Sequence, residues 1–407
     1  MRTVIIVLAL LCPLAALGEE WSRFRGPNGT GVSDATTIPT TWTVKDFLWK
    51  VEIPGAGHSS PVVWGDKVFV TSADKSGKRL VVCLDAASGK TRWRKEFAAT
   101  SYKTHQRNSI ATSTPAVDSE RVYLAWATPE KLTLMALDHQ GEVVWQNDHG
   151  PFKSQHGFGV SPILHGDLVI LPNDQDNAGS IIAVEAKTGK VRWTVPRKPK
   201  NATYSTPCIY QPRGQPAELI FTNWQHGVTS LDPKTGKTLW EISIFEVNKQ
   251  ERAIASPVIA GDLILATCGF VTAQKHFVAV KPPTGDGKPE EVWRIEKAVS
   301  YLPTPLVKGD LVFLCSEVGM GTCLNAKTGK ILWQERVGEN FSASPVCASD
   351  RIYCVGNDGV VVVLAASEKF QILAKNALGE PTQSTPAISD GRMFLRTEAH
   401  LIAVGAK

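Results

Sequence analysis

Polar side chains that could bind a ligand or transfer a proton gather in four loops between residues 101 and 227. These loops read SYKTHQRNS from 101, FKSQHGFG from 152, PNDQDNAGS from 172 and TNWQHG from 222. Imidazoles can transfer protons near pH 7, and carboxylates are oxygen ligands that suit calcium. The candidate residues for a ligand- or partner-binding face are His105, Arg107, Asn108, His156, Asn173, Asp174, Asp176, Trp224 and His226.

Neither kind of chemistry is complete in these loops. No nucleophile or orienting partner can be identified for His105 or His156, and Asp174 and Asp176 lack the further oxygen ligands of a calcium site. No CxxC or Cys/His spacing indicates zinc, so the metal content stays open. For any single residue, a solvated loop tip is the alternative interpretation. As a group, the residues are about as consistent with a ligand site at a funnel mouth as with solvated loop tips.

The loops differ in length, which also indicates where a site could lie. From a recurrent tryptophan to the next Ser/Thr-Pro pair the shortest connections span 12 residues, as from Trp333 to Pro345, whereas the connection from Trp93 to Pro115 spans 22. Binding residues concentrate on loops carried by a rigid scaffold. The long connection and its neighbours are therefore expected to share one face of the molecule.

The scaffold that carries these loops is encoded by a sequence motif that occurs eight times. Each copy has a Ser/Thr-Pro pair, a short apolar run, a tight polar turn and a second apolar run, at intervals of 40 to 54 residues. A self-similar period of this size is typical of solenoids, arrays and propellers. The prolines of the eight copies are Pro61, Pro115, Pro162, Pro207, Pro257, Pro305, Pro345 and Pro386.

A second recurring phrase places one tryptophan in each unit. It reads LDAASGKTRW up to Trp93 and LNAKTGKILW up to Trp333, with a glycine where a hairpin turn needs a positive φ. A large ring with one N–H can fill the seam between two sheets and donate to a backbone carbonyl there. The structural wedge residues expected from this pattern are Trp49, Trp93, Trp145, Trp193, Trp240, Trp293 and Trp333.

Each unit is expected to form four short strands, near 60–64, 67–72, 79–85 and 91–97 in the first copy. The last unit supplies only three strands before the chain stops, while 46–54 carries Trp49 in the wedge position ahead of the first unit. The sequence therefore predicts an all-β, eight-bladed β-propeller of four-stranded antiparallel blades. An N-terminal strand would close the ring and remove an exposed sheet edge.

Three segments are expected along the chain. Residues 1–18 have Arg2, an apolar core and small residues before Glu19, which is typical of a secretory signal cleaved after Gly18. Residues 19–45 form a Gly/Pro-rich arm expected to lie over the ring, and 46–407 form the propeller. The mature chain is then secreted or periplasmic, has no transmembrane segment, and is expected to be a monomer.

Charge and cysteines set further bounds. The formal net charge of +5 is too small to indicate nucleic-acid binding. Of eight cysteines, Cys12 lies in the signal segment, and most of the others fall in strands, where a buried thiol acts as a small hydrophobe. Cys315 and Cys323 are symmetric about Gly319, so a disulfide across that hairpin is a hypothesis, although directly opposed strands suit its geometry poorly.

From Trp49 to the C-terminus, the Ser/Thr-Pro phrase and the TGKxxW phrase together resemble the repeat of the pyrroloquinoline quinone (PQQ)-like β-propellers. The arm WxxFRGPxGxG resembles the first segment of secreted bacterial members. The resemblance implies one of two kinds of protein. Quinoprotein dehydrogenases hold PQQ and calcium over the propeller axis, whereas non-catalytic members include the periplasmic scaffold lipoprotein of the outer-membrane β-barrel assembly machinery.

The dehydrogenase pattern is incomplete in this chain. Two adjacent cysteines, long insertions, and a matching set of calcium-binding carboxylates with a catalytic aspartate are not found. The expected function is therefore a non-catalytic binding or scaffold module of the cell envelope, with no cofactor and with an envelope protein or glycan as partner. The alternative is a PQQ-dependent oxidoreductase with an atypical site that holds PQQ and calcium. A non-redox enzyme using His105 and His156 is a third possibility.

Overall fold

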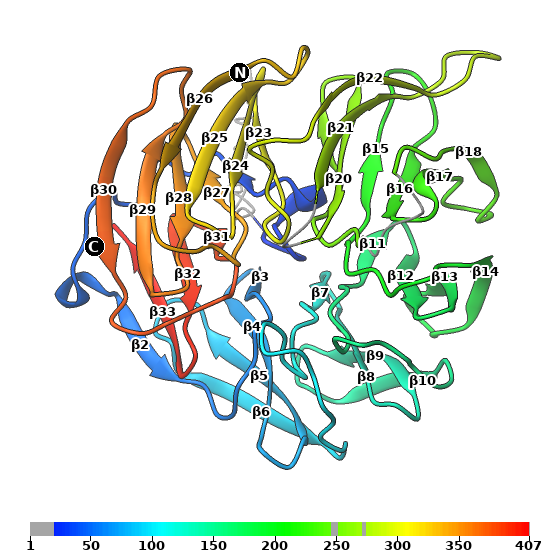
Figure 1. The fold of residues 1–407 in the computed structure, drawn as a ribbon. Coiled ribbons are helices and arrows are strands. Elements are labelled where there is room, and N and C mark those ends of the chain that lie inside the picture. Colours follow the sequence, from blue (N-terminus) through cyan, green and yellow to red (C-terminus); the bar gives the residue numbers. More distant parts are fainter. Residues whose placement is uncertain (1–19, 246–250, 271–273, 407) are drawn as a thin grey trace, which may run out of the picture.

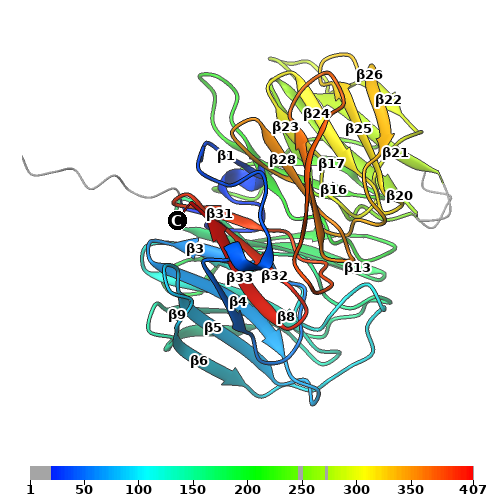
Figure 2. The same cartoon turned by 90° about the vertical axis from the view of Figure 1, so that its left-hand side faces the viewer.

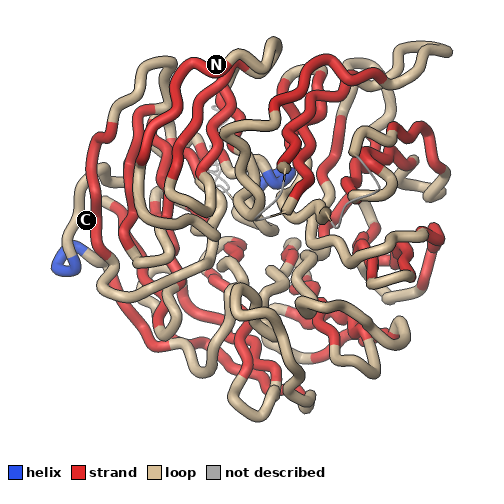
Figure 3. Tube along the Cα trace, viewed as in Figure 1, coloured by secondary structure: helices blue, strands red, loops and turns tan. Residues whose placement is uncertain are grey.

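In the computed structural model, which describes residues 20–245, 251–270 and 274–406, eight β-sheets stand around a common axis (Figure 1). The predicted fold class, an all-β eight-bladed propeller, is confirmed. Among the described residues the only helical segments are two three-residue 3-10 turns, η1 (Pro27–Gly29) and η2 (Val44–Asp46) (Figure 3). The predicted signal segment, 1–18, lies outside the described residues.

Each of the first four blades is a meander of four antiparallel strands, ordered from the axis outward. In the first blade, the strands lie close to the ranges predicted from the sequence. The strands are β3 (Val62–Trp64), β4 (Lys67–Ala73), β5 (Arg79–Asp85) and β6 (Thr91–Phe97); β7 (Ala116–Val117), β8 (Arg121–Ala127), β9 (Leu132–Asp138) and β10 (Val143–Asp148); β11 (Ile163–His165), β12 (Leu168–Gln175), β13 (Ala178–Glu185) and β14 (Val191–Arg197); β15 (Cys208–Tyr210), β16 (Glu218–Asn223), β17 (Gly227–Leu231) and β18 (Thr238–Ile242).

Blades five to seven repeat this meander, and the eighth blade has three strands from the C-terminal end of the chain. The strands are β19 (Val258–Ala260), β20 (Leu263–Gly269), β21 (Lys275–Lys281) and β22 (Glu290–Ile295); β23 (Leu306–Lys308), β24 (Leu311–Cys315), β25 (Met320–Asn325) and β26 (Ile331–Arg336); β27 (Val346–Ala348), β28 (Arg351–Val355), β29 (Val360–Ala365) and β30 (Ile372–Ala377); β31 (Ala387–Ser389), β32 (Arg392–Arg396) and β33 (His400–Gly405).

The ring is closed by an early strand, as the sequence predicts. Strand β2 (Trp49–Glu52) pairs antiparallel with β33, so that Trp49 lies opposite Ala403. This pairing supplies the fourth strand of the eighth blade from the opposite end of the chain, which removes an unpaired edge at β33.

The recurrent tryptophans lie between successive blades. The ring of Trp49 packs on Gly89 of the next blade, where φ is +70° and a Cβ would lie 2.7 Å from the indole. The glycine therefore serves both the turn and the seam. Six indole N–H groups donate to carbonyl oxygens of the following blade at 2.8–3.3 Å, in the pairs Trp49–Ala86, Trp93–His139, Trp145–Ala186, Trp193–Pro233, Trp293–Ala326 and Trp333–Ser367.

Trp240 departs from this pattern because the fifth blade has the PPTGDGKP insertion instead of the short glycine turn. Its indole N–H donates to the Glu218 carboxylate of its own blade at 2.8 Å. The indole is still buried, with 7% of the residue exposed.

The N-terminal arm lies against the ring. Trp21 is fully buried and exchanges backbone hydrogen bonds with Val63, while strand β1 (Val32–Ser33) pairs in parallel with β27 and makes the seventh sheet five-stranded (Figure 2). In Figures 1 and 3, η1 lies near the centre of the ring. The arm thus reaches from the rim of the ring to its axis.

No disulfide bond joins the cysteines of the described chain in this structure, and all of these cysteines are buried. The hypothesised Cys315–Cys323 disulfide is not formed. In the hairpin register Cys315 lies opposite Gly321, and Cys323 lies opposite Phe313, so the two cysteines are offset along the ladder rather than facing one another. The described residues include no helix that is long and apolar enough to span a membrane.

Candidate functional site

A pocket of about 430 Å³ occupies the axis of the propeller. Its wall is made by residues that immediately precede the first strand of each blade. Because all eight blades contribute, the pocket belongs to the ring as a whole and is positioned by the rigid sheets. The groups that decide its chemistry are the eight Ser/Thr hydroxyls, Phe24, His58, His105, Arg107, His156, Tyr204, Tyr301 and Gln383.

A chain of hydrogen bonds runs around this wall. In the first seven blades the residue before the repeated proline donates its backbone N–H to the side-chain oxygen of the same residue in the next blade. This bond satisfies a buried N–H that faces the axis and has no neighbouring strand. Seven successive bonds of 3.0–3.3 Å follow the order Ser60, Thr114, Ser161, Thr206, Ser256, Thr304, Ser344 and Thr385.

Sequence reasoning missed this role of the hydroxyls. It used the proline of each Ser/Thr-Pro pair, whose missing N–H suits the start of a strand, and left the preceding residue unexplained. The signal was present, because serine and threonine alternate strictly through the eight copies. A hydroxyl at the same position in every unit could have indicated a bond between units.

The arm closes one end of the pocket. Phe24 lines the pocket, and the buried Arg25 donates to the carbonyl oxygens of Thr304, Pro305 and Pro345 at 2.9–3.3 Å. These carbonyls, and that of Pro207, which accepts from Arg23, lie at or just after the Ser/Thr-Pro pairs. The predicted loops lie just before these pairs. The arm therefore forms the floor of the pocket, and the loops form its mouth.

Two predicted histidines meet at that mouth. The rings of His105 and His156 are 4.8 Å apart between centroids and nearly perpendicular. The backbone N–H of Arg107 donates to Nδ1 of His105 at 3.2 Å, and the amide of Asn108 donates to the carbonyl of His156 at 2.8 Å. Four of the predicted residues, from two successive blade-to-blade loops, thus form one rim.

The rim contains groups available to a ligand. Burial, followed by the nearby Arg252 and His105, lowers the pKa of His156 to about 4, so this imidazole is neutral at pH 7. Its Nδ1 is buried and has no hydrogen-bond partner in the described structure. The same is true of Oε1 of Gln383. His105 and Arg107 are exposed. The mouth therefore combines solvent-facing donors with unsatisfied polar atoms deeper in the pocket.

His58 is a site residue that the sequence interpretation missed. It precedes the first Ser/Thr-Pro pair and lines the pocket beside Ser60. Burial and the Arg396 guanidinium lower the pKa of His58 to about 4. Aromatic groups complete the wall, among them Tyr204, whose hydroxyl hydrogen-bonds Ser154 at 2.8 Å and whose pKa burial raises to about 12.

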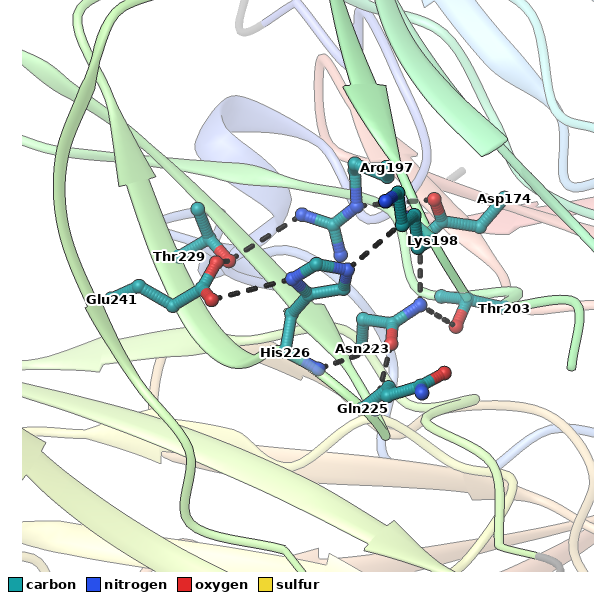
Figure 4. A network of polar contacts seen from close by, with 9 residues as sticks. All are labelled: Asp174, Arg197, Lys198, Thr203, Asn223, Gln225, His226, Thr229 and Glu241. Atoms are coloured by element: carbon teal, nitrogen blue, oxygen red, sulfur yellow. Dashed lines mark hydrogen bonds and ion pairs between the residues drawn. The ribbon is translucent and has the colours of Figure 1, made fainter. Parts of the chain in front are cut away.

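Two of the other predicted residues, Asp174 and His226, belong to a separate, internally bonded network between the third and fourth blades (Figure 4). Asp174 accepts from Arg197 Nε at 3.1 Å and from the Asn223 amide at 2.7 Å, with side-chain exposures of 3% for Asp174 and 4% for Arg197. His226 Nδ1 lies 3.3 Å from Glu241, while its Nε2 accepts from a backbone N–H. These polar groups bond to the protein itself.

The remaining three predicted residues are also engaged internally. Asp176 accepts backbone N–H groups of Gln155 and Ala202 at 2.8 Å. Asn173 accepts from the Gln175 amide at 3.0 Å, and Trp224 is 2% exposed with Lys200 Nζ 5.9 Å from its ring. None of Asn173, Asp174, Asp176, Trp224 and His226 lines the axial pocket.

The pocket can be compared with the calcium–quinone pair that the resemblance implies. Calcium requires several oxygen ligands, ordinarily including carboxylates. No aspartate or glutamate is among the described residues that line the pocket, and the described ranges contain no cluster of three or more His, Cys, Asp or Glu side chains suited to a metal. Arg107 and His105 suit anionic groups, but the residues present do not fit calcium.

Comparisons with known proteins find both a dehydrogenase and an outer-membrane assembly factor among the similar proteins. A polyvinylalcohol dehydrogenase of Pseudomonas sp. is 25% identical over 282 residues, covering 58% of this chain and 42% of its own length. Outer membrane protein assembly factor BamB of Burkholderia pseudomallei is 24% identical over 387 residues, 91% of each chain.

Solved structures show the same fold. BamB of Moraxella catarrhalis has a TM-score of 0.65 at 16% identity, covering 88% of this chain and 97% of that chain. Quinohemoprotein alcohol dehydrogenase of Comamonas testosteroni has a TM-score of 0.68 at 14% identity, covering 97% of this chain and 82% of that chain. Identities this low indicate the architecture and not the activity.

A family model described as outer membrane protein assembly factor BamB matches residues 41–206, 162–317, 273–369 and 322–406. These matches overlap and together extend over the whole ring, from just before β2 to β33. The chain therefore belongs to the PQQ-like β-propeller family represented by that model.

Proposed function

We propose that the protein is an exported, non-catalytic β-propeller that binds a partner in the cell envelope through the mouth of its axial pocket. The observation that carries this proposal is the contrast in the pocket between exposed donors at the rim, His105 and Arg107, and the lack of a carboxylate among its described lining residues. Such a site can hold an anionic group. In the described structure, no imidazole of its three histidines is hydrogen-bonded to a carboxylate or to a lining hydroxyl, as the ring of an activating base would be.

The chemistry of the mouth favours a partner with an anionic group. Arg107 offers five N–H donors in a planar fork that suits a carboxylate, and its neighbour His105 has a further donor nitrogen. The proposed partner is therefore an envelope protein or glycan that presents an acidic group at the rim. The similarity to outer membrane protein assembly factors supports the protein partner.

A charge-reversal pair tests this proposal. Arg107→Glu should abolish co-purification of a discrete envelope component under mild cross-linking. Lys103→Glu, the same change on an exposed residue of the same loop that does not line the pocket, should retain it. Equal capture by both variants, or by neither, would contradict a partner site at the rim.

The second candidate is a PQQ-dependent oxidoreductase with an atypical site. It is favoured by the axial position of the pocket, its cationic rim and the dehydrogenases among the relatives. Calorimetric titration of the metal-stripped protein with PQQ, with and without calcium, separates the candidates. The binding-module proposal predicts no binding in either titration, whereas tight one-to-one binding would support the oxidoreductase.

A further inference from the structure

Two sulfur atoms meet at the seam between the sixth and seventh blades. Cys315 is the last residue of β24 and Cys354 lies in β28, and their Sγ atoms are 2.9 Å apart. This separation is below the roughly 3.5–4.0 Å at which even unbonded carbon atoms contact best, although sulfur is the larger atom. The two residues are 2% and 1% exposed.

The other seams indicate what this position ordinarily contains. Cys315 stands ten residues after its repeat proline, Pro305, and Cys354 stands nine residues after Pro345. The same offsets give Ala125 with Leu171 at the seam of blades two and three, and Val355 with Leu395 at the seam of blades seven and eight. Each of these pairs shares one hydrophobic core. At these two seams both positions are apolar and lie in one core, and at the seam of the sixth and seventh blades both are cysteines.

The other two cysteines of the same core are turned to different partners. Cys347 Sγ donates to the carbonyl of Ser349 at 3.1 Å, and Cys323 lies opposite Phe313 in the hairpin register. Neither is a candidate partner for Cys315 by these contacts. The packing therefore selects one pair out of four thiols.

We propose that Cys315 and Cys354 form a disulfide that joins the sixth blade to the seventh. Each thiol gives up its proton and together they lose two electrons as the Sγ–Sγ bond forms. A disulfide-bearing oxidant accepts both electrons, and its own S–S bond breaks to leave two thiols. The proposal does not depend on the identity of the partner at the pocket mouth.

Burial sets when this bond can form. Contact with Cys315 and burial raise the pKa of the Cys354 thiol well above its usual value, which suppresses the reactive thiolate once the seam has closed. An oxidant also has no access to sulfur atoms that are almost fully covered. The bond therefore forms while the blades assemble, and in the folded protein it resists external reductants.

The seam concerned is also the one that the arm bridges. Nη1 of Arg25 donates to the carbonyl of Thr304 in the sixth unit and to that of Pro345 in the seventh. A disulfide between the second strands of these blades would hold this seam at a second point. It would thus help to position the two carbonyls that receive the arm.

Differential alkylation tests the proposal directly. The denatured, reduced chain is refolded in a glutathione redox buffer, unfolded without reductant, and alkylated before and after reduction, and the cysteine peptides are identified by mass spectrometry. We expect Cys315 and Cys354 to be alkylated only after reduction. Before reduction, their two peptides should appear as one cross-linked species about 2 Da lighter than the two thiol peptides together. The other five described cysteines should be labelled before reduction. Labelling of Cys315 and Cys354 before reduction, or a link from either to another cysteine, would overturn the proposal.

Variants in the same core provide the matched controls. Cys354→Ala should leave Cys315 reactive without reduction, whereas Cys323→Ala should keep the cross-link. The thermal midpoint of the oxidised wild type should fall by several degrees when the protein is refolded in reductant, and that of Cys354→Ala should not respond. A midpoint of the wild type that is indifferent to redox conditions during refolding would count against the bond even if Cys354→Ala fails to fold.

Discussion

The rim of the axial pocket and the polar network of the third and fourth blades contain similar polar side chains, yet these side chains are used in opposite ways. At the rim, Arg107 is exposed and Nδ1 of His156 lacks a partner. In the network, Asp174 is bonded to Arg197 and Asn223 and almost no solvent reaches it. The difference teaches that a polar residue type on a loop indicates a binding site only when its hydrogen-bonding capacity is not satisfied within the fold.

The largest effect that separates the two regions is expected in the network. Asp174→Ala leaves the buried Arg197 guanidinium without its carboxylate, which should cost about 3–5 kcal/mol of unfolding free energy. Chemical denaturation measures this loss. The double variant Asp174→Ala with Arg197→Met should recover much of it, because no buried charge is then left unpaired. A single variant as stable as the wild type would show that the network is not a structural unit.

A smaller effect is expected in the ring of hydroxyls below the rim. Thr114→Val keeps the shape of the side chain but removes the acceptor of the Ser60 N–H. The unsatisfied donor should cost about 1–3 kcal/mol. Thr114→Ser retains the hydroxyl and serves as the matched control. The measurement is again the denaturation midpoint, and equal midpoints for the two variants would mean that the bond contributes little.

Two histidines of the pocket should contribute to the dependence of stability on pH. The pKa values of His58 and His156 are lowered to about 4, so below the ordinary value near 6.5 the unfolded chain binds more protons than the folded one at these two residues. Their contribution to stability is therefore full above pH 6.5, falls as the pH decreases toward 4, and is lost below that value. Allowing for their contact with solvent, the two histidines should account for on the order of 1 kcal/mol.

Replacement of His156 by Asn checks this assignment. The variant should show a shallower loss of thermal midpoint between pH 6.5 and 4 than the wild type. A steeper loss in the His156 variant would contradict a neutral imidazole at the rim.

The smallest effect on stability is expected at the exposed rim. Arg107→Ala should change the unfolding free energy by no more than about 0.5 kcal/mol, because the residue is exposed on a loop and its side chain bonds no buried group. Under the proposed function the same variant weakens partner binding. A destabilisation comparable to that of Asp174→Ala would erase the distinction between the two regions.

Much of the fold could be predicted because the same strand and turn pattern recurs eight times in the sequence. The strand expected at 67–72 is β4 (Lys67–Ala73), and the strand expected within 46–54 is β2, which closes the ring. Gly89 shows why the glycine of the repeat is so informative about the fold. Its positive φ makes the turn, and the absence of a Cβ makes room for Trp49 of the preceding blade.

The candidate site could be predicted only in part. His105, Arg107, Asn108 and His156 meet because consecutive blade-to-blade loops lie on one face. Asp174 could not be separated from them by residue type, because its partner Arg197 is 23 residues further along the chain and reaches it only across the folded blade. His58 and Phe24 were missed because only the closed ring brings them to the axis.

The sequence by itself determined the strand order, the number of blades and the closing strand, because these depend on local periodicity and on a period that is repeated along the chain. Only the tertiary structure decided which polar groups remain available, which residues form the floor of the pocket, and that Cys315 meets Cys354 and not Cys323. The reason is physical. A hydrogen bond or a sulfur contact depends on distances between blades, and those distances exist only once the ring has closed.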